Sequence, residues 1–297
     1  MRPSIVIVNW FLLLCLILLW GTSFLFTALA VETIDPLSIV FYRVLIGALV
    51  LTLYLFACGK RLPRSIQSWR IFLLFGFVGY LFPFFLISWG QQTIDSGLAG
   101  MIMAIMPLIT MLLAHYFIPG EDLNAFKIIG FTLGITGVII LLGPIFRVTM
   151  LETLSGIAVF VAACSYAVNS ILVRRLPRFD PVVAGAGLLI ASSLALLIPW
   201  WLLGRPINET ASATPLIALI WLGIGPTGIA TIILFVVIDR AGPTFLSTIN
   251  YLIPVVAFFS GVMFLDEPLS WISLLALAII LAGISLTRFR ADHNARK

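Results

Sequence analysis

Residues 5–26 of this chain read IVIVNWFLLLCLILLWGTSFLF, 22 positions without a single charged side chain. A helix of about 20 apolar residues is long enough to cross the ~30 Å hydrocarbon core of a bilayer. Secretory signal peptides have apolar cores of only about 7–15 residues, so this run is too long to be one, although Ala28-Leu29-Ala30 resembles a cleavage site. We expect the run to remain in the protein as a membrane-spanning helix.

Comparable apolar runs continue along the rest of the chain. The spans predicted from them are 7–28, 37–57, 69–89, 96–117, 125–142, 154–174, 182–203, 215–238, 244–264 and 270–289. Hydrophobic residues make up 62% of the 297 positions and charged residues 10%. A typical soluble domain has about 25% charged residues, so a soluble fold could not cover its surface with so few. The predicted fold class is therefore an all-α integral membrane protein with ten transmembrane helices, which leaves no room for a soluble catalytic domain.

The basic residues are distributed unevenly between the two sides of these spans. Fourteen of the 17 fall on one side: Arg2, Lys60, Arg61, Arg64, Arg70, Lys127, Arg174, Arg175, Arg178, Arg240, Arg288, Arg290, Arg296 and Lys297. Cytoplasmic loops collect Lys and Arg, so both termini are expected in the cytoplasm, here of a bacterial inner membrane. Topology and anionic lipid head groups then explain the net charge of +5, and no nucleic-acid partner is expected.

Residues suited to metal binding or disulfide formation are few and scattered. Cys15, Cys58 and Cys164 show no paired spacing, and His115 and His293 are the two histidines. A zinc site or disulfide framework needs clustered cysteines or histidines. We therefore expect no metal and no cofactor.

The acidic residues also argue against an enzyme embedded in the membrane. Such an enzyme usually gathers acids, histidines or lysines in one interfacial site. Here Glu121-Asp122 and Asp266-Glu267 are predicted on opposite sides of the membrane, so they cannot form one site. The sequence predicts a protein that is not an enzyme.

Several features recur at a nearly constant offset of 145 to 147 positions. The pairs are Asp35-Pro36 with Asp180-Pro181, Gly97 with Gly242, Pro107 with Pro254, Glu121 with Glu267, and Gly137 with Gly283. This regularity predicts two homologous halves, residues 1–146 and 147–297, with five helices each. Because five is odd, the halves would enter the membrane from opposite sides, as in the inverted repeats of many secondary transporters.

The motif Trp20-Gly21-Thr22-Ser23-Phe24, the Asp35-Pro36 pair followed by Arg43, and the two proline–acid pairs identify a family resemblance. On these residues the whole chain resembles the EamA-type branch of the drug/metabolite transporter superfamily. Within that branch it looks most like the YddG-type exporters of aromatic and other hydrophobic amino acids. The resemblance implies a basket of eight helices, four from each half, around a central cavity, with the fifth and tenth helices at the sides. The second half departs from the pattern, since Leu188 corresponds to Arg43.

Small residues mark one face of the fifth span and one of the tenth. Gly130, Gly134 and Gly137 share a face, and so do Ala278 and Ala282. Small residues four apart let helices approach closely in lipid. The contact could be made within one molecule or between two, so a monomer or a weak dimer is expected.

Polar and aromatic residues inside the spans are candidates for substrate contact. A buried amide in hydrocarbon needs a partner, so the faces that carry these residues should point inward. The candidate substrate-binding residues are Trp20, Phe24, Tyr80, Tyr166, Asn169, Thr227, Asn250 and Tyr251. Hydrogen bonding between helices would explain any single one of them equally well.

The two halves are expected to contribute unequally to this site. At offsets of 145 and 147, the first-half counterparts of Tyr166, Asn169, Asn250 and Tyr251 are Gly21, Phe24, Met103 and Ala104. None of these four side chains forms hydrogen bonds. Polar recognition is therefore predicted from the second half and apolar contact from the first.

Four prolines lie inside predicted spans at nearly matching positions in the two halves: Pro83, Pro107, Pro226 and Pro254. A proline in a helix removes a backbone hydrogen bond and bends the axis. Paired interruptions of this kind often mark the binding midplane or the gating hinges of a transporter. Ordinary kinks, which are common in membrane helices, are the alternative.

Charge separates the remaining function classes. No acidic residue is predicted at mid-membrane, whereas a proton-coupled carrier usually needs a buried carboxylate there. Arg43 is predicted about 10 Å inside its span. It either snorkels outward to pair with Asp35 or Glu32, or attracts the carboxylate of a substrate. The resulting hypothesis is a facilitator or exporter of small neutral or zwitterionic metabolites, plausibly hydrophobic amino acids. A multidrug exporter of lipophilic or cationic compounds is the alternative.

Overall fold

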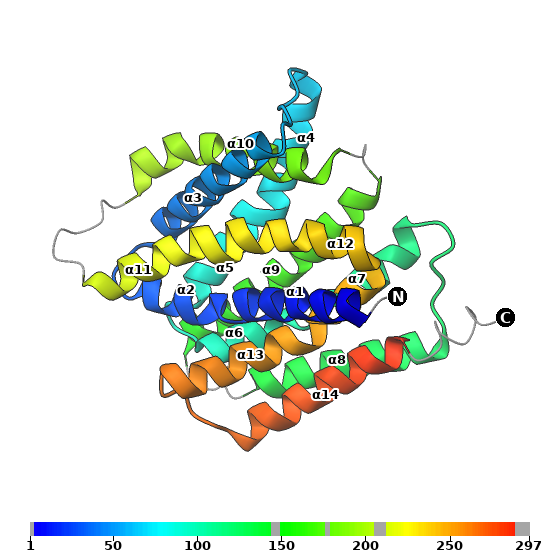
Figure 1. Ribbon diagram of the computed structural model, residues 1–297. Helices are drawn as coiled ribbons and strands as arrows, with labels where there is room; N and C mark the ends of the chain where they lie inside the picture. Colours follow the sequence, from blue (N-terminus) through cyan, green and yellow to red (C-terminus); the bar gives the residue numbers. More distant parts are fainter. Residues whose placement is uncertain (1–2, 144–148, 176–178, 205–211, 289–297) are drawn as a thin grey trace.

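The computed structural model describes residues 3–143, 149–175, 179–204 and 212–288, and every regular element within them is helical (Figure 1). The elements are α1 (Pro3–Gly21), α2 (Ser23–Val31), α3 (Pro36–Ala57), α4 (Ile66–Gly76), η1 (Phe77–Leu81), α5 (Phe82–Gly90), α6 (Ser96–Met103), α7 (Met106–Phe117), α8 (Ala125–Leu142), α9 (Met150–Arg175), α10 (Pro181–Leu203), α11 (Ala213–Leu222), η3 (Gly223–Ile229), α12 (Ala230–Leu246), α13 (Ile249–Phe264) and α14 (Trp271–Arg288). The predicted boundary between the halves and the basic tail after residue 288 lie outside the described residues.

Within the described residues, eight helical segments are long and apolar enough to cross a membrane. They are Val6–Val31, Pro36–Ala57, Ile66–Gly90, Ser96–Phe117, Ala125–Leu142, Met150–Arg175, Pro181–Leu203 and Ala213–Gly242. The apolar helices Ile249–Phe264 and Trp271–Thr287 are shorter. All of these segments coincide with apolar runs seen in the sequence, so the all-helical membrane fold class is confirmed.

Two helices begin at the Asp-Pro pairs found in the sequence. The Asp35 side chain accepts a hydrogen bond from the Ser38 N–H at 3.0 Å, and Pro36 is the first residue of α3. Asp180 accepts from the N–H groups of Val182 and Val183 in the same way at the start of α10. An aspartate cap satisfies a free helical N–H, and a proline in the first turn has no N–H to leave unpaired.

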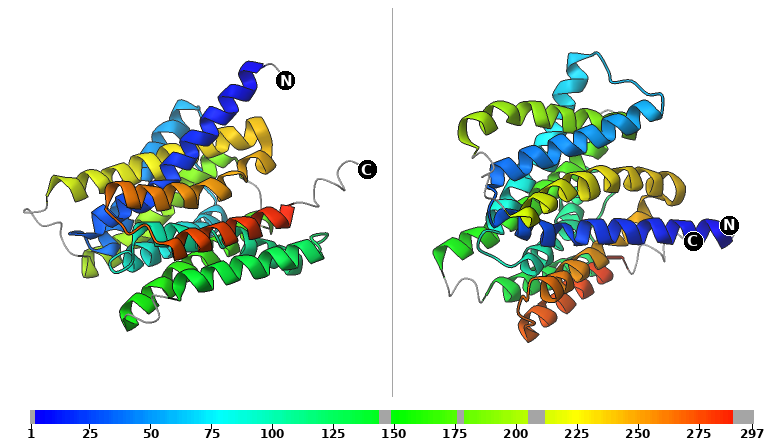
Figure 2. Two further views of the ribbon diagram at one scale, coloured as in Figure 1. Left: turned by 90° about the horizontal axis from the view of Figure 1, so that it is seen from below. Right: turned by 60° about the vertical axis from the view of Figure 1, so that its left-hand side comes forward.

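The two halves of the chain are interleaved. Helix α1 packs against α12 and α13 of the second half, while α9 packs against α5 and α7 of the first half. Helix α3 lies beside α10 (Figures 1 and 2). The buried cores are therefore built jointly; one of them brings Ile102 and Leu108 together with Ala162 and Phe258. Each half completes the packing of the other.

Helices α8 and α14 run side by side at one edge of the bundle (Figures 1 and 2). A Cβ on Gly130 would lie 2.5 Å from the Gly283 carbonyl oxygen, and a Cβ on Gly283 would lie 2.6 Å from that of Gly130. The glycines of the fifth span thus serve close packing within one molecule. Ala278 and Ala282 do not take part in this contact, because both are exposed, so a contact of their face between molecules stays a prediction. The face of α14 that meets α8 carries Gly283 instead.

The third and eighth spans each contain a π-helical turn, η1 and η3, whose first residues are 146 positions apart. Pro226 lies inside η3, and Pro83 lies at the start of α5 directly after η1. A side chain from the other half bonds to each turn: Trp20 Nε1 donates to the Pro226 carbonyl at 3.0 Å, and Ser165 Oγ donates to the Val78 carbonyl at 2.7 Å. Carbonyls released by the widened turns thus find partners within the protein.

The fourth and ninth spans are also interrupted, but at different points. Helix α6 ends at Met103, and α7 begins with Pro107 in its first turn. In the second half, α12 continues through Gly242, whose φ of 81° breaks the helical geometry, and α13 starts only at Ile249. The predicted start of the ninth span at residue 244 therefore falls inside α12.

Candidate functional site

A cavity of about 710 Å³ lies between the two halves of the bundle. Its wall reaches the protein surface at Glu121, Lys127 and Arg174, whose side chains are 42%, 21% and 52% exposed. The connection from α7 to α8, the first turn of α8 and the last turn of α9 carry these residues. They lie at the end of the bundle where α1 begins and α14 ends, which we call the termini end (Figure 1). We call the opposite end, where α13 leads into α14, the far end.

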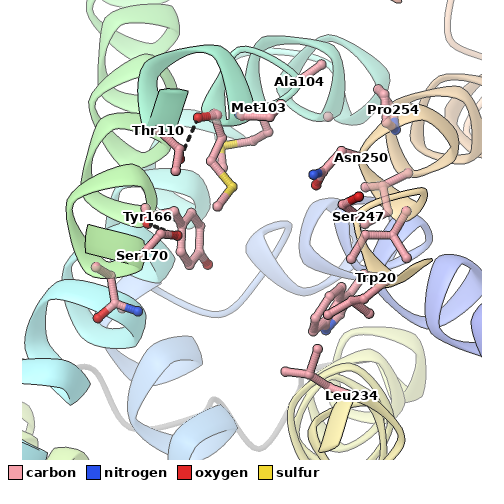
Figure 3. A pocket seen from close by; sticks show the side chains of 18 of the residues that line it. Trp20, Met103, Ala104, Thr110, Tyr166, Ser170, Leu234, Ser247, Asn250 and Pro254 are labelled. Carbon is pink, nitrogen blue, oxygen red and sulfur yellow. Dashed lines mark hydrogen bonds between the residues drawn. The ribbon is translucent and has the colours of Figure 1, made fainter. Parts of the chain in front are cut away.

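The inner wall of the cavity combines aromatic rings, amides and sulfur. Figure 3 shows Tyr166 of α9 facing Asn250 and Trp20 across an open space. Met103 and Ala104 border the same space. Apolar walls with a few polar groups are typical of small-molecule sites, and the volume lies within the usual range for them.

Most residues predicted from the sequence are brought together around this cavity. The predicted substrate-contact residues that line it are Trp20, Phe24, Tyr80, Tyr166, Asn169 and Asn250, together with Arg43 and the prolines Pro107, Pro226 and Pro254. They come from both halves, and the expected inequality in substrate recognition stays a prediction. Arg43 and Tyr80 give the first half its own polar groups.

Arg43 is buried, with 6% of its surface exposed, and its guanidinium lies in the cavity wall. Its Nε donates to the hydroxyl of Thr227 at 2.9 Å, and its Cζ lies 3.7 Å from the centre of the Phe84 ring. The predicted snorkelling pair with Asp35 or Glu32 is therefore wrong, because Asp35 caps α3 and Arg43 points into the bundle. Among the described residues no carboxylate pairs with this guanidinium.

Thr227 supports Arg43 from behind the cavity wall. It is 1% exposed and is absent from the lining, whereas the sequence placed it among the substrate contacts. Its hydroxyl donates to the Leu222 carbonyl at 2.8 Å, a bond that spans the π-helical turn. With its proton committed there, the oxygen is oriented to accept from Arg43.

Tyr251 and Pro83 also lie outside the lining. The Tyr251 hydroxyl donates to the Ile284 carbonyl of α14 at 3.4 Å, so this side chain faces α14. Neighbouring helical residues point about 100° apart, which is why Asn250 faces the cavity and Tyr251 does not. Pro83 is buried at the start of α5.

Phe84 is a lining residue that the sequence analysis missed. It lies one turn after Tyr80 and meets it edge to face, with ring centres 5.5 Å apart. The four-residue spacing from Tyr80 is the signal that could have found it. Thr110 and Ser23, which also line the cavity, carry no comparable signal.

The far end of the cavity is closed by contacts between the halves. Both oxygens of the Glu267 carboxylate accept backbone hydrogen bonds at the start of α6, from Ser96 N–H at 2.6 Å and from Gly97 N–H at 2.9 Å. Within the first half, Gln91 Nε2 donates to the Phe24 carbonyl at 3.1 Å. Asp95 occupies the N-cap position of α6 but makes no side-chain cap. Burial, together with the charges of Glu267 and Glu152, raises the pKa of Asp95.

Within the described residues, a bundle of apolar helices surrounds a mainly apolar cavity with a few polar groups that reaches the surface beside Glu121 and Arg174, an arrangement typical of membrane transport proteins. The EamA-like transporter family matches this chain twice, over residues 8–143 and 153–289. The chain therefore belongs to the EamA-like transporter family and is a multi-pass membrane protein.

Its relatives are also named as transporters or as members of related groups. The uncharacterized transporter YoaV of Bacillus subtilis (strain 168) is 24% identical over 92% of this chain and 94% of its own length. The uncharacterized inner membrane transporter YedA of Escherichia coli (strain K12) is 25% identical over 92% of this chain and 88% of its own. The WAT1-related protein At3g02690, chloroplastic, of Arabidopsis thaliana is 26% identical over 96% and 70%, respectively.

A solved crystal structure of another protein has the same fold. It covers 97% of this chain and 99% of its own, with a TM-score of 0.70 and 23% sequence identity. At this identity the likeness concerns the fold alone.

Proposed function

We propose that this protein carries small zwitterionic metabolites, in particular hydrophobic and aromatic amino acids, out of the cytoplasm of a bacterium. Ten helices in two inverted halves alternate between a state open at the termini end and a state open at the far end. The termini end faces the cytoplasm, in keeping with the basic residues on that side. The membership in a transporter family and the single-ended cavity support this proposal.

Arg43 is the observation that carries the choice of substrate. A buried guanidinium that no carboxylate of the described residues pairs with is costly, because its charge has lost water and gained mainly neutral partners such as the Thr227 hydroxyl and the Phe84 ring. A substrate carboxylate would supply the missing counter-charge and could accept two parallel hydrogen bonds. Phe84 and Tyr166 offer apolar surface to the remainder of the substrate.

The same charge disfavours the alternative of a multidrug exporter for lipophilic cations. A cationic compound would gain cation–π contacts with Trp20 and Tyr166. It would also enter a cavity that already holds the positive charge of Arg43. The described lining includes one carboxylate, Glu121, which lies at the mouth and pairs with Arg174 at 3.3 Å. A zwitterion or a carboxylate therefore fits the cavity better than a cation.

Counterflow into proteoliposomes tests the proposal directly. Proteoliposomes that contain the purified protein are loaded with unlabelled phenylalanine. Uptake in exchange is then measured for labelled phenylalanine, alanine and phenethylamine, which lacks the carboxylate. We expect exchange of phenylalanine, weaker exchange of alanine, and none of phenethylamine. Arg43→Gln should weaken phenylalanine exchange by about tenfold or more, since a hydrogen bond to a charged group is lost.

A matched variant controls for loss of folding. Thr227→Val removes the hydroxyl that orients Arg43 but keeps the guanidinium, so it should weaken exchange less than Arg43→Gln does. Preferred exchange of phenethylamine, or an Arg43→Gln variant that exchanges phenylalanine normally, would overturn the proposal.

A further inference from the structure

Glu121 and Glu267, 146 positions apart, each directly follow a residue with positive φ. These two residues lie in the left-handed region, Gly120 with φ 84° and Asp266 with φ 54°. Asp266 is the one non-glycine residue with positive φ in the described part of the chain. Residues other than glycine rarely adopt this conformation, so its presence at the matching position indicates that the conformation is needed.

Glu267 joins the two halves at the far end. It belongs to the second half, yet its two oxygens accept hydrogen bonds from Ser96 and Gly97 of the first half. A carboxylate at a helix N-terminus is favoured by both the free N–H groups and the helix dipole. The space is tight, because a Cβ on Gly97 would lie 3.0 Å from Glu267 Oε2, and a Cβ on Gly261 would collide with the same oxygen.

The matching contact at the termini end is not made. At the repeat offset, Ser96 and Gly97 correspond to Ala241 and Gly242. Glu121 instead pairs with Arg174 at 3.3 Å and with Lys127 at 3.9 Å, beside the open mouth of the cavity. Glu267 therefore caps backbone N–H groups of the other half at the closed end. Glu121 also binds the other half, but through the exposed side chain of Arg174 beside the open mouth.

We propose that Glu267 and Glu121 are alternating latches, each of which closes one end of the cavity by capping backbone N–H groups of the other half. When the cavity opens at the far end, Glu267 leaves Ser96 and Gly97. Glu121 then leaves Arg174 and accepts hydrogen bonds from Ala241 and Gly242. This inference rests on the inverted repeat and alternating access of the proposed function.

The two latches are not equal. At the offset of 146, His115 stands where Gly261 stands, and its ring already contacts the Glu121 carbonyl at 3.0 Å. Gly261 has no side chain to crowd the Glu267 carboxylate, whereas the Glu121 carboxylate would have the His115 imidazole beside it. The far-end latch is therefore the stronger, which makes the state open at the termini end the resting state.

Distances between spin labels at each end of the bundle test the latches without any substrate. The native Cys15, Cys58 and Cys164 are first replaced by Ala. One label pair, at Gln92 and Leu269, spans the far end; a second pair, at Asp122 and Asp239, spans the termini end. All four labelled positions are exposed.

We expect Glu267→Gln to raise the population with a long far-end distance and a short termini-end distance by about tenfold, because a charge-assisted cap is lost. Glu121→Gln should shift the populations in the opposite direction. Asp95→Asn removes a neighbouring carboxylate that makes no cap, and should leave the ratio within about twofold. Unchanged distances in Glu267→Gln, or a shift in the same direction for both glutamates, would overturn the latch.

Ser96→Pro provides a second route to the same result if Glu267→Gln does not fold. It removes the backbone N–H that donates to Glu267 Oε1 and leaves the carboxylate in place. Proline is tolerated in the first turn of a helix, so α6 should still form. The variant should shift the distances as Glu267→Gln does, and unchanged distances would count against the latch. Failure of amino-acid exchange with latch shifts intact would refute only the substrate, whereas exchange without latch shifts would refute only the latch.

Discussion

Trp20 and Arg43 both bond to the same π-helical turn, η3. The indole N–H of Trp20 donates to the Pro226 carbonyl, and Arg43 donates to the hydroxyl of Thr227, the next residue. A π-helical turn widens the helix and turns groups outward that an α-helix would use internally. At the residue scale, this irregular turn is what fixes two of the larger groups in the cavity wall.

Asn250 and Tyr251 form a matched pair for testing the cavity wall. Asn250→Ala should weaken substrate affinity by about two- to tenfold, because one hydrogen bond of about 0.5–1.5 kcal/mol is lost. Tyr251→Phe removes a hydroxyl that faces α14, so transport should stay close to that of the parent. Affinities of both variants for phenylalanine, measured by counterflow, check this. Equal effects of the two variants would contradict the assigned faces.

At the scale of elements, the α8–α14 contact depends on the absence of side chains. Gly130→Val would place methyl groups against the Gly283 carbonyl, which a Cβ alone would approach to 2.5 Å. We expect the free energy of unfolding in detergent to fall by about 1–3 kcal/mol, the usual cost of overpacking. Ile129→Val on the exposed face of the same helix is the control and should change stability little. Thermal unfolding followed by circular dichroism measures both.

A surface ion pair ties the loop after α3 to the start of α10. Lys60 Nζ lies 2.7 Å from Asp180 Oδ2. The hydrogen bond to Lys60 lowers the pKa of Asp180, so the stability it contributes is present above the ordinary aspartate pKa and lost as pH falls through the lowered value. The hydrogen bond to Asp180 raises the pKa of Lys60, whose contribution is lost as pH rises through that raised value.

Both contributions of this pair are therefore present between about pH 5 and pH 9. Across that range we expect the unfolding midpoint of the parent to exceed that of Lys60→Gln slightly. The difference should disappear as pH falls through the lowered pKa of Asp180, and it should shrink at high salt, since both side chains are exposed. A difference that persists at low pH would show that the pair is not its source.

The regular helices could be predicted from the sequence because neighbouring residues along the chain determine where they form. Apolar runs and the Asp35-Pro36 pair depend on neighbouring residues alone, and the structure has helices at those positions. The π-helical turns could not be predicted, because Pro226 is equally compatible with an ordinary kink. The face of α14 that meets α8 could not be predicted either, since Ala282 fits the small-residue pattern as well as Gly283 does, and only the partner helix decides between them.

The sequence predicts which side chains line the cavity better than it predicts how they are oriented, because residues far away in the chain determine the orientation. The side chains that line the cavity include most of those expected, because polar groups in hydrocarbon must face inward. The orientation of the Arg43 guanidinium depends on its hydrogen bond to Thr227, 184 positions away. The position of the Glu267 carboxylate depends on its hydrogen bond from Ser96, 171 positions away. No local pattern encodes either contact.

At the scale of the whole molecule, the distribution of charge predicts how transport is driven. Glu121, the carboxylate in the described lining, is held at the mouth by Arg174, so none is placed to carry a proton through the cavity. We expect phenylalanine flux in proteoliposomes to follow the substrate gradient and to change little when an imposed pH gradient is collapsed. Accumulation against the substrate gradient that a protonophore abolishes would contradict this.

The interleaving of the halves also constrains how the protein is made. Trp20 and its partner Pro226 are 206 positions apart, and α1 packs against α12 and α13. At about 5–20 residues per second, the ribosome needs on the order of 10–40 s to produce that partner after α1 has emerged. During that interval the Trp20 face of the first helix must be covered by lipid, by the insertion machinery or by a chaperone.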